Sequence, residues 1–341
     1  MVSVGVFGAS GFAGAELLRL LAGHPELEVA LVTGDTHART PVAELYPNLA
    51  GFYGELVYQP SQPELAEGLD VAYLAMPHGV SQTVVPELLG RVKHVVDLAA
   101  DFRLSDPALY PEWYGESHVV PDLLSEFAYG IPELWRSDIV AARNVAAPGC
   151  YPTAAILPLA PLAAAGLIEP TGIVVDAASG VSGGGRGKFP FCGTDEDFSA
   201  YGLLHHRHTP EIEQALTRAS AKPSQVIFTP HLAPMNRGIL ATCYARPASS
   251  TSTDELLACL HAAYDSEPFV VVSTASPSTK ATMGANTAHL TVRYDTRTGW
   301  VLALCAIDNL VKGTSGQAIQ CTNLILGLPE TMGLPIVGLN P

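Results

Sequence analysis

One cysteine of this sequence lies in a setting that suits a nucleophile. Cys150 falls between Pro-Gly and Tyr-Pro in the stretch AAPGCYPTAAIL (residues 146–157), and a helix is predicted to begin at Pro152 or Thr153. Backbone N–H groups and the dipole at a helix N-terminus stabilise a thiolate. Isolated cysteines are nevertheless among the most buried residues, so this stretch alone favours a structural thiol. Other residues have to decide between the two.

A histidine cluster further along the chain offers an acid/base group. Residues 205–208 read HHRH, and Thr209-Pro210-Glu211 is typical of a helix start, so the histidines precede a helix. A metal site is not expected, because no acidic or cysteine partner stands at a ligand spacing nearby and Arg207 would repel a cation. Two interpretations stay open: a solvent-facing cluster, or one histidine acting as acid/base with Glu211 as its orienting group.

A glycine-rich turn near the N-terminus predicts a dinucleotide site. Gly8, Gly11 and Gly14 follow the apolar run Val2–Phe7 and precede the helical pattern Ala15–His24. A strand, a glycine turn and a helix together direct backbone N–H groups and the helix dipole at a phosphate. The spacing is G-x-x-G-x-x-G, and this context makes it more than an ordinary tight turn.

The residues after the second expected strand, Leu27–Thr33, leave the choice of nucleotide open. Asp35 lies where an acid would bind the free ribose hydroxyls of NAD. Four neighbouring side chains could instead surround a 2′-phosphate: Thr33, Thr36, His37 and Arg39.

A serine motif competes with Cys150 for the chemistry. Residues 180–184, GVSGG, match the G-x-S-x-G nucleophile elbow, which requires a helix directly after the serine. Here GGRGKFP follows, so a serine hydrolase is not expected. The segment Gly180–Lys188 is either a surface turn or a run of backbone donors, with Ser179, Ser182 and Arg186 near an anionic substrate group.

Composition limits the class of protein. The 341 residues are 48% hydrophobic and 15% charged, which is typical of an ordered chain of two domains. A net charge of −15 without basic blocks argues against nucleic acid or an anionic membrane as partner. The six cysteines form no C-x-x-C pair, as expected for free thiols, and no basic region precedes Val2–Phe7 as in a secretory signal. We therefore expect a cytoplasmic protein that does not bind membranes.

The order of the expected elements predicts an α/β fold with two domains. Strands and helices alternate over the first 145 residues, which predicts a doubly wound, Rossmann-type parallel sheet in a dinucleotide-binding domain, residues 1–149. Residues 150–309 predict an α+β domain with a mixed or antiparallel sheet, for catalysis, substrate binding and oligomerisation. The C-terminal helix, Thr314–Leu328, is expected to return to the cofactor domain, which residues 310–341 complete.

A dinucleotide turn, a thiol where the second domain begins and a downstream histidine make one coherent set. Such a set suits a dehydrogenase that works through a thiohemiacetal or thioester, in a site between the domains. The other five cysteines lack this setting, and four of them lie in apolar strand or helix patterns: Cys243, Cys259, Cys305 and Cys321.

The sequence also resembles a known family over nearly its whole length, that of the N-acetyl-γ-glutamyl-phosphate reductases of arginine biosynthesis. More distantly its layout resembles aspartate-semialdehyde dehydrogenase. The Tyr-Pro-Thr after Cys150 separates it from the related aminoadipyl-phosphate reductases. The segments that carry the resemblance are GASGFAGAEL (8–17), HPELEV (24–29), PHGVS (77–81), DLAADFRL (97–104), APGCYPTAA (147–155), SGVSGGGR (179–186), HRHTPEI (206–212), TPHLAPMNRGIL (229–240) and IDNLVKGTSGQAIQ (307–320).

The resemblance implies reductive dephosphorylation of N-acetyl-γ-glutamyl phosphate to the semialdehyde with NADPH, without a metal. It implies Cys150 as the nucleophile, His208 or else His206 as the acid/base, and Glu211 as the group that orients the histidine. The substrate would be bound by Arg103, Arg186, Ser182 and Tyr201. The cofactor would be bound by Gly8, Ser10, Gly11, Phe12, Ala13, Gly14, Thr33, Arg39, Pro77, Asn309 and Lys312.

One departure from the family concerns the 2′-phosphate. The family often has Ser and Arg just after the second strand, where this chain has Gly34-Asp35. We still expect NADP, with Arg39 as a substitute contact. The alternatives are aspartate-semialdehyde dehydrogenase or aminoadipyl-phosphate reductase activity, and, outside enzymes, a dinucleotide-sensing regulator. We expect a homo-oligomer, a dimer or a tetramer.

Overall fold

The computed structural model describes residues 1–187 and 190–340. Lys188, the end of the glycine-rich segment, and Pro341, the end of the expected cofactor domain, lie outside the described residues. The chain forms two compact units: residues 1–148 with 314–334, and residues 149–313 with the segment from 335 onward. No helix of the described part is long and apolar enough to span a membrane.

The first unit contains a six-stranded sheet in which every pairing is parallel, in the order β2-β1-β3-β4-β6-β5. This confirms the predicted Rossmann-type sheet. Because β2 and β3 lie on opposite sides of β1, the order in which strands are added reverses between β1 and β3, which is where doubly wound sheets bind their ligands. The strands are β1 (Val2–Phe7), β2 (Leu27–Val32), β3 (Val71–Leu74), β4 (His94–Asp97), β5 (Phe127–Tyr129) and β6 (Asn144–Ala146).

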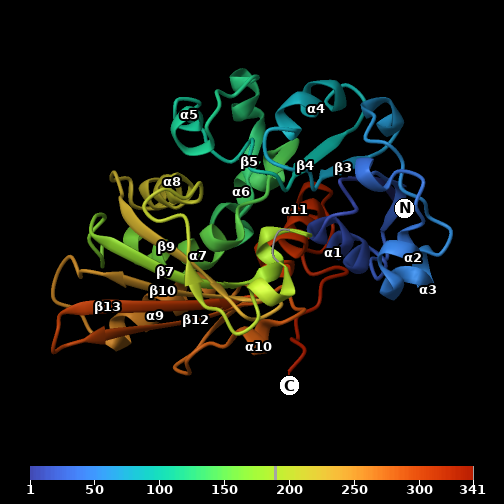
Figure 1. Cartoon of the computed structure of the whole chain (residues 1–341). Helices are drawn as coiled ribbons and strands as arrows, with labels where there is room; N and C mark the ends of the chain where they lie inside the picture. The colour runs from blue at the N-terminus through green and yellow to red at the C-terminus, as the bar shows by residue number, and fades with distance from the viewer. Residues whose placement is uncertain (188–189, 341) are drawn as a thin grey trace. The chain divides into compact units, whose positions relative to one another are not determined.

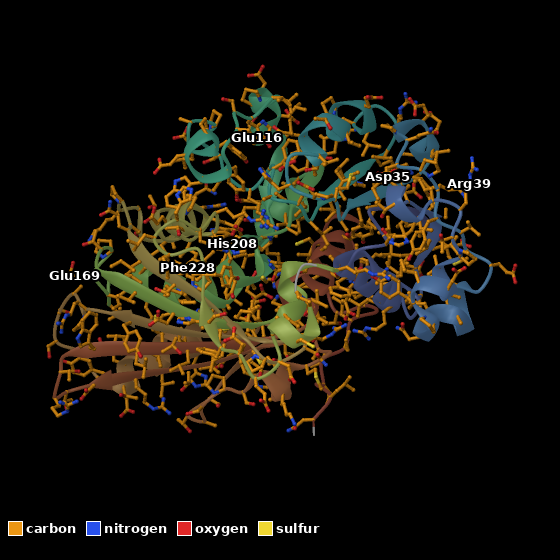
Figure 2. All side chains as sticks on the ribbon, viewed as in Figure 1. Asp35, Arg39, Glu116, Glu169, His208 and Phe228 are labelled. Atoms are coloured by element: carbon orange, nitrogen blue, oxygen red, sulfur yellow. The ribbon has the colours of Figure 1, made fainter. Side chains whose placement is uncertain are left out.

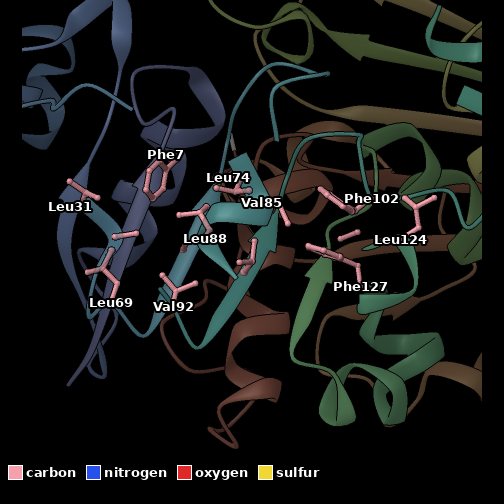
Figure 3. Close-up of a cluster of buried hydrophobic side chains, with 14 of the residues drawn as sticks. Phe7, Leu31, Leu69, Leu74, Val85, Leu88, Val92, Phe102, Leu124 and Phe127 are labelled. Carbon is pink, nitrogen blue, oxygen red and sulfur yellow. The ribbon is translucent and has the colours of Figure 1, made fainter. Parts of the chain in front are cut away.

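Helices cover this sheet because its strands are apolar runs with two buried faces. Helix α1 (Phe12–Leu21) packs against β1, β2 and α11 (Gly316–Ile325), which also contacts β4 and α6 (Pro132–Ala141). Helix α4 (Ser81–Leu88) buries Val85 and Leu88 against Phe7, Leu74 and Phe102 in a single core (Figure 3). The remaining helices of the unit are short: α2 (Val42–Leu45), α3 (Ala50–Tyr53) and α5 (Leu109–Tyr114).

The second unit has a seven-stranded sheet in the order β11-β12-β13-β10-β7-β9-β8 (Figure 1). The sheet is mixed, which confirms the mixed or antiparallel sheet predicted for this half. The pairs β7–β9 and β11–β12 are parallel and the others antiparallel. The strands are β7 (Ile173–Gly180), β8 (Ser199–Ala200), β9 (Val226–Ala233), β10 (Ile239–Ala245), β11 (Val270–Val272), β12 (Ala288–Asp295) and β13 (Trp300–Ile307).

Helix α7 (Cys150–Ala164) is the centre of the second unit. It is apolar on all sides and packs against α8 (Thr209–Ser220), α9 (Thr253–Tyr264), β10 and β13, as expected of a buried helix. The short α10 (Thr279–Thr282) contacts β13.

Two boundaries differ from the prediction. Helix α7 begins at Cys150, not at Pro152 or Thr153. Residues 310–313 and the end of the chain belong with the second unit, whereas residues 310–341 were all expected to complete the first. The physical reason is backbone pairing: the Asn286 N–H donates to the Pro335 carbonyl at 2.8 Å, and the Leu339 N–H donates to the Met283 carbonyl at 2.7 Å.

Candidate active site

Cys150 is the first residue of α7, with Gly149 as the N-cap in an extended conformation. No side chain caps this helix terminus, and the thiol is partly exposed. A Cβ added to Gly313 would lie 2.8 Å from the Cys150 Cβ, so the backbone at residue 313 passes directly beside Cys150. The N-terminal N–H groups and the helix dipole therefore act on a thiol that a reagent can reach.

The buried cysteines behave differently. Burial raises the pKa of the Cys243 and Cys305 thiols well above the ordinary value, which keeps them protonated. Cys321 is also buried, Cys259 is partly exposed and has a pKa raised by burial, and Cys192 is exposed. Among the described cysteines, only Cys150 begins a long helix.

The side chains of Glu211 and His208 both contact Gly149. The carboxylate of Glu211 is fully buried in the first turn of α8, and its Oε1 accepts a hydrogen bond of 2.8 Å from the Gly149 N–H. The His208 ring, 6% exposed, lies so close that a Cβ on Gly149 would be 2.5 Å from its Nε2. Gly149, the residue before Cys150, is thus held by the side chain of Glu211 and covered by the imidazole of His208.

The geometry distinguishes the histidines. The ring of His206 lies 4.7 Å from that of His208, and its Nδ1 accepts the backbone N–H of His208. His205 is exposed. His208, labelled in Figure 2, is therefore the imidazole that packs directly on the residue before Cys150. His206 contacts the His208 ring and backbone. The assignment of the acid/base role to His208 stays a prediction.

Two tyrosines complete the cluster. Tyr201 Oη donates to Tyr151 Oη at 3.0 Å, and Tyr151 Oη donates to the His231 carbonyl at 3.1 Å. Burial raises the pKa of Tyr201 to about 12, and burial raises the pKa of Tyr151 further still. The charge of Cys150 contributes to both shifts, so the phenols lie within electrostatic reach of the thiol and stay neutral. Sequence reasoning included Tyr201 but missed Tyr151, which directly follows the cysteine.

The glycine-rich segment is anchored to the end of β13. Ser182 lies in a short 3-10 turn, Val181–Gly184, and its Oγ accepts a hydrogen bond from Asn309 Nδ2 at 3.0 Å. Asn309 Oδ1 accepts the Gly238 N–H at 2.7 Å, and the side chain is 1% exposed. These bonds of Asn309 hold the turn in place, whereas the nicotinamide contact that the family resemblance implies for this residue stays a prediction.

Three charged residues of the predicted site differ in accessibility. Arg186 is exposed. Lys312 has no exposed surface, and its Nζ lies 5.8 Å from the centre of the Phe269 ring. Arg103 is 8% exposed and donates to the carbonyls of Ala147 and Leu98, both at 2.8 Å. Arg186 therefore lies at the surface, whereas Arg103 and Lys312 are buried.

The N-terminal glycine turn has the form that a dinucleotide requires. Gly8 has φ of +78°, and a Cβ there would lie 2.5 Å from the Ala75 carbonyl oxygen. A Cβ on Gly14 would lie 2.4 Å from the Ala9 Cα, so only glycine lets α1 pack this close to the end of β1. Gly11 is the N-cap of α1, without a side-chain cap. This helix N-terminus is suited to a pyrophosphate.

The other residues of the predicted cofactor site in the first unit differ in their exposure. Ser10, Phe12 and Ala13 are partly exposed at the start of α1. Thr33 is fully buried, and its Oγ1 accepts the Gly8 N–H at 3.2 Å, so it supports the turn from behind. Pro77, in the loop after β3, is exposed.

Asp35 and Arg39, which bear on the choice of nucleotide, both lie at the surface of the first unit. Asp35 Oδ1 accepts the Ser61 N–H at 2.7 Å. Arg39 adopts a left-handed φ of +72°, and its side chain extends outward in Figure 2. Arg39 is thus exposed, and Asp35 already accepts a hydrogen bond on one carboxylate oxygen, whereas the contact of Arg39 with a 2′-phosphate stays a prediction.

Comparison with known proteins gives the family. Residues 3–142 match the model for the semialdehyde dehydrogenase NAD-binding domain, and residues 150–309 match that for the semialdehyde dehydrogenase dimerisation domain. The chain is 49% identical over 346 residues to the N-acetyl-gamma-glutamyl-phosphate reductase of Desulforudis audaxviator, with 100% of both chains covered. It is 46% identical over 348 residues to that of Citrifermentans bemidjiense, again with 100% of both covered. The chain belongs to the N-acetyl-γ-glutamyl-phosphate reductase family.

Solved structures support the fold of this family member. Aspartate semialdehyde dehydrogenase II of Vibrio cholerae, in complex with ASA, matches with a TM-score of 0.73 at 15% identity, covering 96% of this chain and 98% of that one. The Candida albicans aspartate semialdehyde dehydrogenase with NADP matches with a TM-score of 0.70 at 15% identity, covering 96% and 99%. In the part of this reductase-family chain that is described, no group of three His, Cys, Asp or Glu side chains could hold a metal ion.

Proposed function

We propose that the protein reduces N-acetyl-γ-glutamyl phosphate to N-acetylglutamate 5-semialdehyde and phosphate with NADPH, as a step of arginine biosynthesis. The observation that carries this proposal is the meeting of Cys150, His208 and Glu211 at Gly149 in a member of this family. The functional division into a cofactor domain, residues 1–149 completed by α11, and a catalytic domain, residues 150–309, belongs to the same proposal.

The first half of the reaction uses the thiolate. Cys150 Sγ attacks the acyl carbon of the substrate, the bond from that carbon to the phosphate oxygen breaks, and phosphate leaves. The product is a thioester on Cys150. The α7 N-terminus stabilises the attacking thiolate, and the bond from Gly149 to Glu211 keeps that terminus in place. Exposed Arg186 is the guanidinium best suited to bind the phosphate or the substrate carboxylate, together with Ser182.

The second half of the reaction needs a hydride and a proton. The dinucleotide, when bound, supplies the hydride to the thioester carbonyl. The cradle formed by Gly8, Gly11 and Gly14 fits its pyrophosphate, because side chains at Gly8 or Gly14 would collide with backbone atoms. His208 Nε2 protonates the oxygen of the resulting thiohemiacetal and takes the proton back as the carbon–sulfur bond breaks, which frees the aldehyde and Cys150. Tyr201 remains a neutral neighbour of the thiol.

NADP is the proposed form of the cofactor, with Arg39 as the contact to the 2′-phosphate. The support is the family membership together with the exposed, outward position of Arg39. Kinetics with NADPH and NADH test this choice, and a clear preference for NADH would contradict it.

A homo-oligomer is proposed from the matched dimerisation domain. On β7, β9, β10 and β13, positions that alternate with the buried ones form a cross-strand row that includes Ile227, Val174, Tyr244 and Leu302. Ile227 is 52% and Tyr244 37% exposed. A second copy covering this row would bury it. Sedimentation of the wild type and of Tyr244→Glu tests this, because the variant is expected to have the lower mass.

The decisive assay runs the reaction backward. Phosphate-dependent reduction of NADP is measured with N-acetylglutamate semialdehyde and, separately, with aspartate semialdehyde. Preference for the second substrate would replace the proposal with an aspartate-semialdehyde dehydrogenase. Cys150→Ser should abolish turnover and leave dinucleotide affinity unchanged, whereas near-normal activity of that variant would refute the mechanism. Dinucleotide binding without turnover of either aldehyde would indicate a sensor.

A further inference from the structure

Three buried polar side chains meet at the carboxyl ends of β3 and β4 in the first unit, away from Cys150 in the sequence. Asp97 is the last residue of β4, Ser81 is the first residue of α4, and Asp101 lies in the loop after β4. All three have no exposed surface. The family resemblance assigns no role to any of them.

Asp101 is surrounded by donors. Its Oδ1 accepts the Gly79 N–H at 2.9 Å and lies 2.7 Å from His78 Nδ1. Its Oδ2 accepts the Gln82 N–H at 3.0 Å and the Ser81 hydroxyl at 2.8 Å. Two backbone N–H groups and one hydroxyl donate to its two oxygens, which identifies Asp101 as the ionised carboxylate.

The hydroxyl of Ser81 cannot serve both aspartates as a donor. Its Oγ lies 2.8 Å from Asp101 Oδ2 and 3.2 Å from Asp97 Oδ2, but a hydroxyl has one proton. With that proton on the shorter bond to Asp101, the contact with Asp97 is a hydrogen bond only if Asp97 Oδ2 carries a proton of its own. Without it, two anionic carboxylates would share one hydroxyl in a buried interior. Counting protons therefore makes Asp97 a carboxylic acid that donates to Ser81.

The electrostatic surroundings agree with this count. Burial, followed by the charge of Asp101, raises the pKa of Asp97 to about 7, although the Ala99 N–H and the charge of Arg103 oppose the shift. Burial also raises the pKa of Asp101, but the hydrogen bonds from His78, Gly79, Gln82 and Ser81 outweigh it and leave that pKa below its ordinary value. The two carboxyl groups thus separate into an acid and a carboxylate.

The remaining ionisable groups near the pair face Asp101. His78 also contacts Glu116 of the neighbouring segment, with Nε2 3.4 Å from Oε1. His118 Nε2 lies 2.8 Å from the Asp101 carbonyl oxygen, and Tyr110 Oη donates to the same oxygen. Burial lowers the pKa of His118 and raises that of Tyr110 far above neutrality, so neither takes up the charge of Asp97 near pH 7.

The pair holds a turn at the place where the sheet binds its ligand. The strand order reverses between β1 and β3, and a Cβ on Gly8 would touch Ala75 and Met76 at the end of β3. The next residues, Pro77 to Val80, form the turn whose backbone Asp101 fixes at Gly79. The loop after β3 therefore lies beside the glycine turn, and its shape depends on the two carboxyl groups.

We propose that Asp97 and Asp101 share one proton through Ser81, and that this protonated pair is the positioning group that shapes the loop after β3 for the dinucleotide. The inference deepens the proposed function and rests on it. Loss of the proton places two negative charges at one hydroxyl and disturbs the turn at Pro77. The dinucleotide then binds only to the protonated fraction of the protein.

The main experiment compares Asp97→Asn with the wild type, because an asparagine amide can donate to Ser81 as the carboxylic acid does and has no charge to gain. The dissociation constant of NADPH is measured by fluorescence from pH 6 to pH 9. In the wild type it should rise by up to about tenfold per pH unit above pH 7, and in Asp97→Asn this rise should be missing.

The matched control is Asp70→Asn in the same unit. Asp70 binds Ser3 and Lys93, and the hydrogen bond from Lys93 lowers its pKa, so it does not titrate near pH 7. This variant should keep the wild-type pH profile of the dissociation constant. Ser81→Ala, which removes the shared hydroxyl, should weaken NADPH binding by about tenfold even at pH 6.

A second measurement follows the proton without any ligand. The folding equilibrium constant of the wild type, relative to Asp97→Asn, should fall by up to about tenfold per pH unit from pH 4 to pH 7 and then become constant. A constant ratio over this range would overturn the shared proton. A falling ratio with the same NADPH profile in both proteins would overturn the positioning role. If the wild type binds no NADPH at any pH, the proposed function fails together with the positioning role, and the unfolding measurement still reports whether the proton exists.

Discussion

Gly149→Ala is expected to disable the site by moving one ring, without removing any chemical group. The added Cβ would lie 2.5 Å from His208 Nε2, 2.8 Å from Cε1 and 2.9 Å from Cδ2. Ordinary contacts begin near 3.4 Å, so the imidazole has to move by roughly 1 Å. His208 is 6% exposed and its ring packs against His206 and Tyr151, which hinder its displacement.

The backbone is not a source of strain in this variant. Gly149 has φ of −66° and ψ of 153°, which alanine adopts readily, and the N–H bond to Glu211 is retained. A displacement of 1 Å in a catalytic group costs about 10²-fold, so kcat/KM should fall by about that factor. Overpacking should lower the free energy of unfolding by about 1–3 kcal/mol.

The assays are phosphate-dependent NADP reduction and denaturant unfolding, and the control is Gly51→Ala. A Cβ on Gly51 meets nothing within 4 Å, so this control should change neither quantity. When Gly149→Ala is combined with His208→Ala the ring is gone, and the loss of stability caused by the added Cβ should disappear. Activity of Gly149→Ala within twofold of the wild type would refute the contact between His208 and the residue before the nucleophile.

Three further changes test other parts of the structure. Thr33→Val removes the acceptor of the Gly8 N–H, so the free energy of unfolding should fall by about 1–3 kcal/mol and NADPH should bind more weakly, whereas Thr33→Ser should behave as the wild type in both measurements. Glu211→Leu should slow alkylation of Cys150 by iodoacetamide, because the Gly149 N–H loses its acceptor, and Glu211→Gln, which keeps an acceptor oxygen, should restore much of the rate. Burial lowers the pKa of His24, so its contribution to the free energy of unfolding is complete above pH 6.5 and is lost as the pH falls. The loss amounts to up to about 1.4 kcal/mol per pH unit. His24→Gln should lack this pH dependence in unfolding curves from pH 5 to 8.

The sequence correctly placed Cys150 at a helix N-terminus, but it placed the start of that helix two residues late. Proline is commonest at the first helical position, which placed the start at Pro152. The first turn of a helix has no intrahelical N–H bonds, so a proline fits its third position equally well. The actual start makes Cys150 itself the first helical residue and Gly149 the cap. The prediction for Cys150 thus required only that a helix begins at or just after this residue, and an error of two residues in its start did not affect it.

The choice between the histidines could not come from the sequence. His206 and His208 lie two residues apart in the same loop before α8, and what separates them is the contact of His208 with Gly149, about sixty positions away along the chain. A glycine before the cysteine was visible, but nothing local indicates which side chain fills the space that its missing Cβ leaves. Long-range packing of α8 on α7 decides it.

The segment DLAADFRL shows why charged residues in a family motif need not touch a ligand. Arg103 was expected to bind an anion, because a guanidinium suits carboxylate and phosphate. In the structure the backbone carbonyls of Leu98 and Ala147, which follow β4 and β6, lie in the interior and require donors, and Arg103 supplies them. Asp97 and Asp101 of the same segment hold the loop after β3 through Ser81. The polar residues of this motif therefore form hydrogen bonds with backbone groups of the protein itself. They act on the reaction indirectly, through the shape of the loop after β3.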